Sequence, residues 1–341
     1  MKQAHFAILS IAAAAIMFGG CSSKSYFEPK QVEGKVDFDS KISSKLVSVN
    51  AQGATMENGQ FVTKKGIGKF ALPKGFEFLS QTGSLVVASN DFGDVIVFDD
   101  SGKEIAKHNF DLKIATASAK DGKLALIATD NTSVLYDYQT SSVLFKQKND
   151  TAFAVDSKIA APYFLEALVI FPTFDGKLLV VDTNEKKIVR DVVVSSEKNF
   201  NNVIFFDIID NKLVAATPTK VVSINPKTAN FLDADVADII FVKEGIYVFT
   251  KDGKIILTDT DLRVLKEKKF PFARFVGVIH GKYIYAVEKE GYLIATDINL
   301  GTSNIFKFSA PFYGMSSTFE GFLFTSGDSI FYDNKQFKLA K

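Results

Sequence analysis

EGIYVFTKDGKIILTDTDLRVLKEKK, residues 244–269, is the stretch that decides the fold of this chain. Apolar residues alternate with others from Ile246 to Thr250, and Lys-Asp-Gly then supplies a turn. A second apolar run begins at Ile255 and is closed by Asp259. Runs of this length with period-two alternation, separated by Gly and Asp, are typical of β-strands joined by tight turns. The stretch therefore predicts a meander of antiparallel strands.

The same unit recurs along the chain with spacings of 34 to 45 residues. Its closing residues are Asp99, Asp137, Asp182, Asn225, Asp259, Asp297 and Asp333. No segment keeps a helical pattern for more than about two turns. Four short strands per repeat, repeated about eight times, is the sequence form of a β-propeller. We therefore predict an all-β chain, with residues 41–341 forming a propeller of eight blades and four antiparallel strands per blade. Seven blades is the alternative, because the first unit is degenerate.

Closure of the ring requires the two ends of the repeat region to meet, since an unpaired last blade would expose a sheet edge. Val36–Asp39 precedes the first unit and is expected to pair with the C-terminal blade. The runs that predict this eighth blade are Tyr313–Thr318, Phe322–Thr325, Ile330–Asp333 and Phe337–Leu339.

The N-terminus differs in pattern from the repeats that follow it. Lys2 is followed by an apolar run from Phe6 to Met17, which predicts a signal peptide over residues 1–20. The run ends in Phe-Gly-Gly before Cys21, the only cysteine of the chain, and this resembles a lipobox. The prediction is therefore lipidation of Cys21 and a polar tether over residues 21–40. By the same resemblance, Ser22 after the cysteine favours the outer membrane, facing the periplasm.

Charge and motifs exclude several functions. Without Lys2 the chain has 39 basic and 39 acidic residues, so it lacks the excess of positive charge that is typical of nucleic-acid-binding proteins. His108 and His280 have no partnering motif, and no nucleotide-binding or hydrolase motif occurs. The recurrent aspartates are spread one per repeat, which predicts a role in turns, because Asp and Asn bond their own backbone two residues on. We therefore predict no catalytic residues, no metal ligands, no cofactor and no enzyme activity.

One segment has the composition of a protein-binding site. Phe270-Pro271-Phe272-Ala273-Arg274 joins one predicted blade to the next and combines aromatic residues with an arginine. Such residues are enriched at interface hot spots. Phe270, Phe272 and Arg274 are therefore candidate partner-binding residues, with burial in the core as the alternative for the aromatic rings.

The Cys21 pattern and the repeats, as in Gly83–Ser89 and Gly93–Asp99, resemble the pyrroloquinoline-quinone-type β-propeller lipoproteins. The resemblance implies a non-enzymatic scaffold of the outer membrane whose partners are β-barrel assembly proteins or other envelope proteins. The quinone enzymes of this fold use a tryptophan and vicinal cysteines, and this chain has no tryptophan and one cysteine. Two alternatives remain open: a metal-dependent, lactonase-like propeller hydrolase, and a propeller displayed on the cell surface as an adhesin or ligand-binding module.

Overall fold

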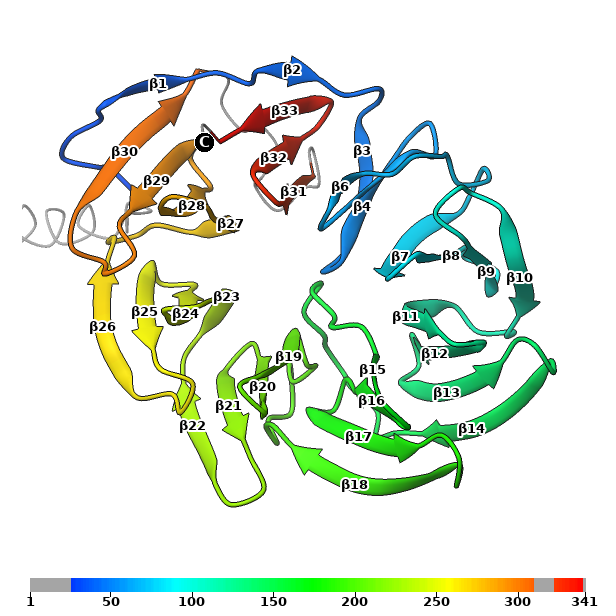
Figure 1. Ribbon diagram of the computed structural model, residues 1–341. Coiled ribbons are helices and arrows are strands. Elements are labelled where there is room, and N and C mark those ends of the chain that lie inside the picture. The colour runs from blue at the N-terminus through cyan, green and yellow to red at the C-terminus, as the bar shows by residue number, and fades with distance from the viewer. Residues whose placement is uncertain (1–25, 310–321, 340–341) are drawn as a thin grey trace, which may run out of the picture.

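The chain forms a closed ring of eight blades around a central opening (Figure 1). The structure is a computed structural model, and it describes residues 26–309 and 322–339. The described residues form 33 strands in eight sheets, seven of four strands and one of five. The prediction of an all-β, eight-bladed propeller is confirmed, and the seven-bladed alternative is wrong because the degenerate first unit is a complete sheet.

Each blade is an antiparallel meander that starts at the axis and ends at the rim. Blades one to four consist of β3 (Leu46–Val49), β4 (Gly53–Met56), β5 (Phe61–Thr63) and β6 (Gly66–Ile67); β7 (Glu77–Thr82), β8 (Leu85–Ser89), β9 (Asp94–Phe98) and β10 (Glu104–Asn109); β11 (Ile114–Lys120), β12 (Lys123–Ala128), β13 (Thr132–Asp137) and β14 (Ser142–Lys148); and β15 (Tyr163–Leu165), β16 (Leu168–Pro172), β17 (Lys177–Asp182) and β18 (Lys187–Val193).

The remaining blades complete the ring and use two strands from the N-terminal segment. Blades five to eight consist of β19 (Phe205–Ile209), β20 (Lys212–Thr217), β21 (Lys220–Ile224) and β22 (Ala229–Asp233); β23 (Val236–Val242), β24 (Gly245–Thr250), β25 (Lys254–Thr258) and β26 (Val264–Lys269); β27 (Phe275–His280), β28 (Ile284–Glu288), β29 (Tyr292–Thr296) and β30 (Ser303–Phe308), with β1 (Gly34–Val36) added; and β31 (Leu323–Ser326), β32 (Ser329–Tyr332) and β33 (Lys335–Lys338), with β2 (Ser40–Lys41) as the fourth strand.

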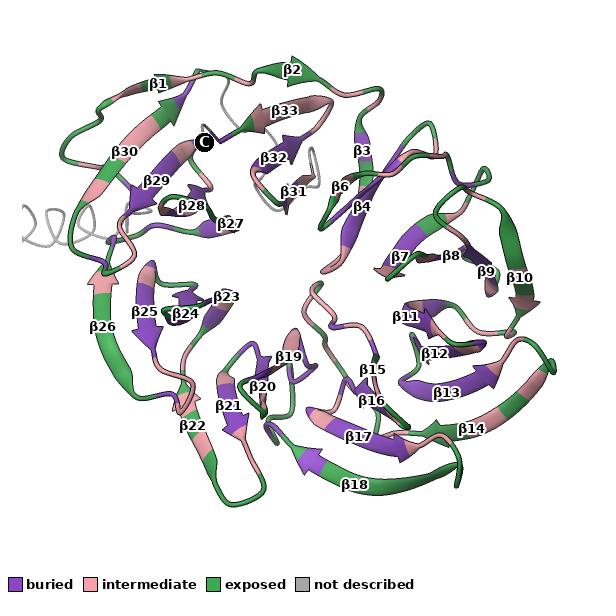
Figure 2. Cartoon of the chain, viewed as in Figure 1, coloured by how far each residue is buried: buried purple, intermediate pink, exposed green. Residues whose placement is uncertain are grey.

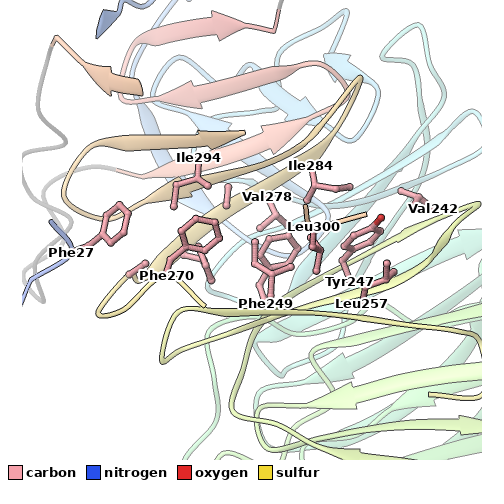
Figure 3. Close-up of a cluster of buried hydrophobic side chains, with 14 residues drawn as sticks. Phe27, Val242, Tyr247, Phe249, Leu257, Phe270, Val278, Ile284, Ile294 and Leu300 are labelled. Atoms are coloured by element: carbon pink, nitrogen blue, oxygen red, sulfur yellow. The ribbon is translucent and has the colours of Figure 1, made fainter. Parts of the chain in front are cut away.

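The hydrophobic core lies between the blades. The two middle strands of a blade are buried on both faces, whereas the outer strands are largely exposed (Figure 2). Eight clusters of buried side chains fill the eight junctions between neighbouring blades. Figure 3 shows the cluster between blades six and seven, where Tyr247 and Phe249 of β24 pack against Ile284 of β28. Sheet-on-sheet packing of this kind requires apolar side chains on both faces of each middle strand.

The ring is closed by the N-terminal segment. β2 pairs antiparallel with β33, and the Asp39 amide donates to the Gln336 carbonyl at 2.9 Å. The N-terminal segment does pair with the C-terminal blade, but the predicted residues are wrong: Ser40–Lys41 form the paired strand, whereas Val36 pairs with Phe308 of the seventh blade. Among the described strands of blade eight, β31 is the innermost, so Phe322–Thr325 is an inner run and not the second run predicted. Tyr313–Thr318 lies outside the described residues.

Part of the segment predicted to be a polar tether packs against the ring. Phe27 is buried between blades six and seven, where its ring meets those of Phe270 and Tyr292 edge to face. β1 then pairs in parallel with β30. Within the predicted tether of residues 21–40, Phe27 and the two short strands attach the segment to the rim of the ring. Cys21 and the predicted signal peptide lie outside the described residues.

The recurrent aspartates form turns, as predicted. In six of the seven positions, the side-chain oxygen accepts a hydrogen bond of 2.8 or 2.9 Å from the backbone amide two residues on. Backbone hydrogen bonds from Glu185 and Asn184, for example, lower the pKa of the Asp182 carboxyl. These side chains therefore stabilise the turn that leads into each outer strand.

Candidate binding face

One face of the ring carries the long connections. In an antiparallel four-strand meander, the turn between the second and third strands and the connection to the next blade lie on the same face. Backbone hydrogen bonds between these two kinds of segment show this: the Phe110 amide donates to the Gly93 carbonyl at 3.0 Å, and the Phe270 amide donates to that of Gly253 at 2.8 Å. We call this side of the ring the loop face, defined by residues 90–93, 149–162, 194–204 and 270–274.

The loop face exposes phenylalanine side chains. Phe92 is 82% exposed, Phe153 85%, Phe200 50% and Phe272 59%, and each sits in a different segment of the face. The Phe200 amide donates to the Ala154 carbonyl at 2.8 Å, which holds the segment of Phe153 beside that of Phe200. Val155 is also exposed there, so three apolar side chains are exposed on two paired segments between blades three and five. Large exposed apolar patches on a folded protein mark interaction sites.

Two of these phenylalanines have left-handed backbone conformations. Phe200 has φ 51° and Phe272 has φ 66°. This region is unfavourable for a bulky residue other than glycine. Such a conformation persists only where the surrounding structure determines it, and it is common at functional sites.

Buried asparagine side chains fix the two longest loops. Asn202 is fully buried; its Oδ1 accepts from the Asp156 amide at 2.7 Å, and its Nδ2 donates to the Lys158 carbonyl at 2.8 Å. Asn131 donates to the Asp150 carbonyl at 2.7 Å, and Asn201 donates to the Asp175 carbonyl at 3.0 Å. Because each amide joins segments distant in sequence, the loops that carry Phe153 and Phe200 are held in defined positions.

The structure separates the three predicted partner-binding residues. Phe270 is buried in the core between blades six and seven, as in the alternative considered for it, and so is not available on the surface. Phe272 and Arg274 are exposed on the loop face. Glu288 holds the backbone of Arg274 in place. Its carboxylate accepts a hydrogen bond from the Arg274 amide at 3.2 Å and another from the Glu290 amide at 2.8 Å. Burial raises the pKa of Glu288 to about 7.

Phe92, Phe153 and Phe200 were not among the partner-binding residues predicted from the sequence, although Phe200 was noted there as an aromatic residue that precedes an inner strand. Their one sequence signal is the setting of Phe200 in Asn-Phe-Asn-Asn at the end of a long connection. An exposed phenylalanine has no pattern that distinguishes it from a core phenylalanine in a chain with 33 of them. Its exposure depends on the course of the loop.

Within residues 26–309 and 322–339, no three His, Cys, Asp or Glu side chains are grouped so that they could hold a metal ion. Over the same residues there is no helix long and apolar enough to cross a membrane. His108 packs on the ring of Tyr136, with Nδ1 3.1 Å from the tyrosine hydroxyl, and His280 lines the central channel.

The fold is shared with solved propellers. The chain is similar in structure to BamB. The structure of BamB from Moraxella catarrhalis matches with a TM-score of 0.62 and 13% identity, over 86% of this chain and 94% of that one. Sqt1 from Saccharomyces cerevisiae matches with a TM-score of 0.61 and 11% identity, over 91% of this chain and all of that one. The likeness to BamB agrees with the resemblance found in the sequence, and at these identities the likenesses establish the fold alone.

Two curated proteins are similar in sequence. The plasminogen-binding protein PgbB of Helicobacter pylori strain J99 is 29% identical over 379 residues, covering 97% of this chain and 69% of PgbB. PgbB of strain 26695 is 28% identical over the same shares of the two chains. No protein-family model matches the chain.

Proposed function

We propose that this protein is a lipid-anchored propeller of the outer membrane that acts by binding other proteins through its loop face. The observation that carries the proposal is the set of exposed phenylalanines on that face, held by buried asparagines. Phe153 and Phe200 give a rigid apolar patch, which buries contact area at little cost in side-chain entropy. The similarity to PgbB, whose name describes the binding of a protein, supports this role.

The proposed partner is the β-barrel assembly machinery of the outer membrane, with the propeller facing the periplasm. Purified protein carrying Phe153→Ser and Phe200→Ser is compared with wild type in pull-downs from detergent-solubilised envelope. We expect wild type to recover the barrel-inserting protein and the double variant to recover at least about tenfold less, because truncating one hot-spot aromatic costs about 2 kcal/mol. Phe231→Ser is the matched control, because Phe231 is 55% exposed but lies on the outer strand β22. Recovery of the bait alone by wild type counts against this partner.

The similarity to PgbB favours a second candidate, binding of an extracellular protein by a propeller displayed on the cell surface. Protease treatment of intact cells separates the two. Loss of the protein from intact cells, together with binding of purified plasminogen that the double variant lacks, supports display. Survival of the protein until the cells are lysed supports the periplasmic assignment.

A further inference from the structure

The central channel is a second feature of the molecule, and it is separate from the loop-face patch. It has a volume of about 1070 Å³ and is lined by residues from all eight blades. Several inner strands carry a β-bulge near their start, and the residues that follow the bulges in β7, β23 and β27 are Ser80, Asp238 and Gly277. All three line the channel. Bulges re-aim side chains, and they are frequent beside functional sites.

Three charged side chains converge in this channel. Lys158, from the loop before β15, donates to the Asp238 carboxylate at 2.7 Å and to the Ala237 carbonyl at 2.8 Å. Lys64, from the turn between β5 and β6, places its Nζ 4.7 Å from the centre of the Phe324 ring. Asp238 and Lys158 both act electrostatically on Lys64. The groups therefore share one space, although they come from different blades.

The charges in the channel do not balance. Lys158 is neutralised by Asp238, whereas no carboxylate of the described residues forms an ion pair with Lys64. The lining contains three lysines and two aspartates, so without His280 it carries one excess positive charge. These residues are Lys64, Lys65, Lys158, Asp207 and Asp238. Lys64 remains accessible to solvent, but the surrounding walls desolvate it, and this burial lowers its pKa. A cation that forms no ion pair within the protein is stabilised by a bound anion.

Apolar side chains form part of the walls around these charges. Phe206, Phe241, Phe322, Leu323 and Phe324 line the channel. The hydroxyl of Ser80 is buried beneath the wall and has no hydrogen-bond partner among the described residues. A concave, mainly apolar site with a few convergent polar groups is the usual form of a small-molecule pocket.

We propose that the channel binds a small amphipathic monoanion, a carboxylic acid with an apolar body. Its carboxylate accepts hydrogen bonds from Lys64, and its apolar part packs on the phenylalanine walls. The single excess charge selects a monoanion over a di- or trianion. This site requires neither the lipid anchor nor the partner proposed above.

Octanoate is the probe, and binding is measured by isothermal titration calorimetry with the wild-type propeller. We expect Lys64→Met to weaken binding at least about tenfold, since it removes a charge-assisted hydrogen bond in a desolvated site. Lys64→Arg keeps the charge and is expected to retain binding. Lys74→Met, at an exposed lysine outside the channel, is the matched control.

Two further ligands test the charge argument. Octanol and octylamine have the same chain without the negative charge, and they are expected to bind at least about tenfold more weakly than octanoate. Octanol binding as tightly as octanoate overturns the proposal, and so does unchanged octanoate affinity in Lys64→Met. Thermal unfolding of each variant checks that a loss of binding does not come from loss of the fold.

Discussion

Glu288 is a buried carboxyl that supports the exposed segment of Phe272 and Arg274. Only 1% of the residue is exposed, and its two oxygens accept backbone hydrogen bonds on the inner side of this segment. Burial raises its pKa from 4.5 to about 7, against the opposing effect of those hydrogen bonds. The residue that positions a candidate binding segment is thus itself sensitive to pH near neutrality.

The stability of the propeller is expected to fall as pH rises from about 4.5 to 7 through this group. Between the two values the folded protein holds a proton on Glu288 that the unfolded chain releases, so raising the pH favours unfolding. We predict that the free energy of unfolding of wild type falls, relative to Glu288→Gln, by on the order of 2 kcal/mol between pH 5 and pH 8. Urea denaturation at several pH values measures this. Glu104→Gln, at an exposed position of β10, is the control, and parallel pH curves for wild type and Glu288→Gln would contradict the assignment.

At the scale of elements, the N-terminal segment acts as a strap across the rim of the last two blades. Phe27 is inserted between blades six and seven, β1 extends blade seven, and β2 completes blade eight. Phe38 stacks on Phe308 at 5.2 Å between ring centres, which joins the strap to the core between blades seven and eight. One segment of about fifteen residues thus contacts three blades.

Phe27→Ala is predicted to loosen the strap. Truncating a buried phenylalanine costs about 3–5 kcal/mol in a core, and a site at the rim that can collapse costs less. We expect a lower unfolding temperature and faster proteolytic cleavage within residues 26–41, measured by limited proteolysis and mass spectrometry. Tyr26→Ala is the matched control, since Tyr26 is adjacent and 55% exposed. Equal cleavage rates in the two variants would mean that Phe27 does not hold the strap.

At the scale of the whole molecule, the strap limits how far the propeller stands from a membrane. If Cys21 carries the lipid, only residues 22–26 separate it from Phe27, and a fully extended chain of that length spans roughly 18 Å. The rim at blades six and seven would then lie close to the membrane surface.

Cys21→Ser is predicted to release the protein from the membrane without unfolding it. Acyl chains supply the membrane affinity in this proposal, and Cys21 precedes every residue seen in the core. Cell fractionation is expected to move the protein to the soluble periplasmic fraction, with an unchanged unfolding temperature. Retention in the membrane fraction after a high-salt wash would show that the ring or a partner provides the attachment, and the lipoprotein interpretation of Cys21 would fail.

The sequence by itself determined the strands and turns within each blade. Period-two runs and turn residues are local properties, so the strands of the stretch at 244–269 and the turns at Asp99 through Asp297 follow from neighbouring residues. The number of blades also followed, because each repeat is one sheet. The strands predicted for the last blade differ from those observed, because its fourth strand, β2, comes from the N-terminal end of the chain.

Only the tertiary structure decided which side chains are available for binding. Phe270 and Phe272 differ by two positions in a loop, yet one is in the core and the other is exposed. The proximity of Phe153 to Phe200, and of Lys64 to Asp238, joins residues far apart in the chain through ring closure and loop packing. Side-chain exposure and long-range contacts depend on where whole blades lie relative to one another. Local sequence patterns do not specify that arrangement.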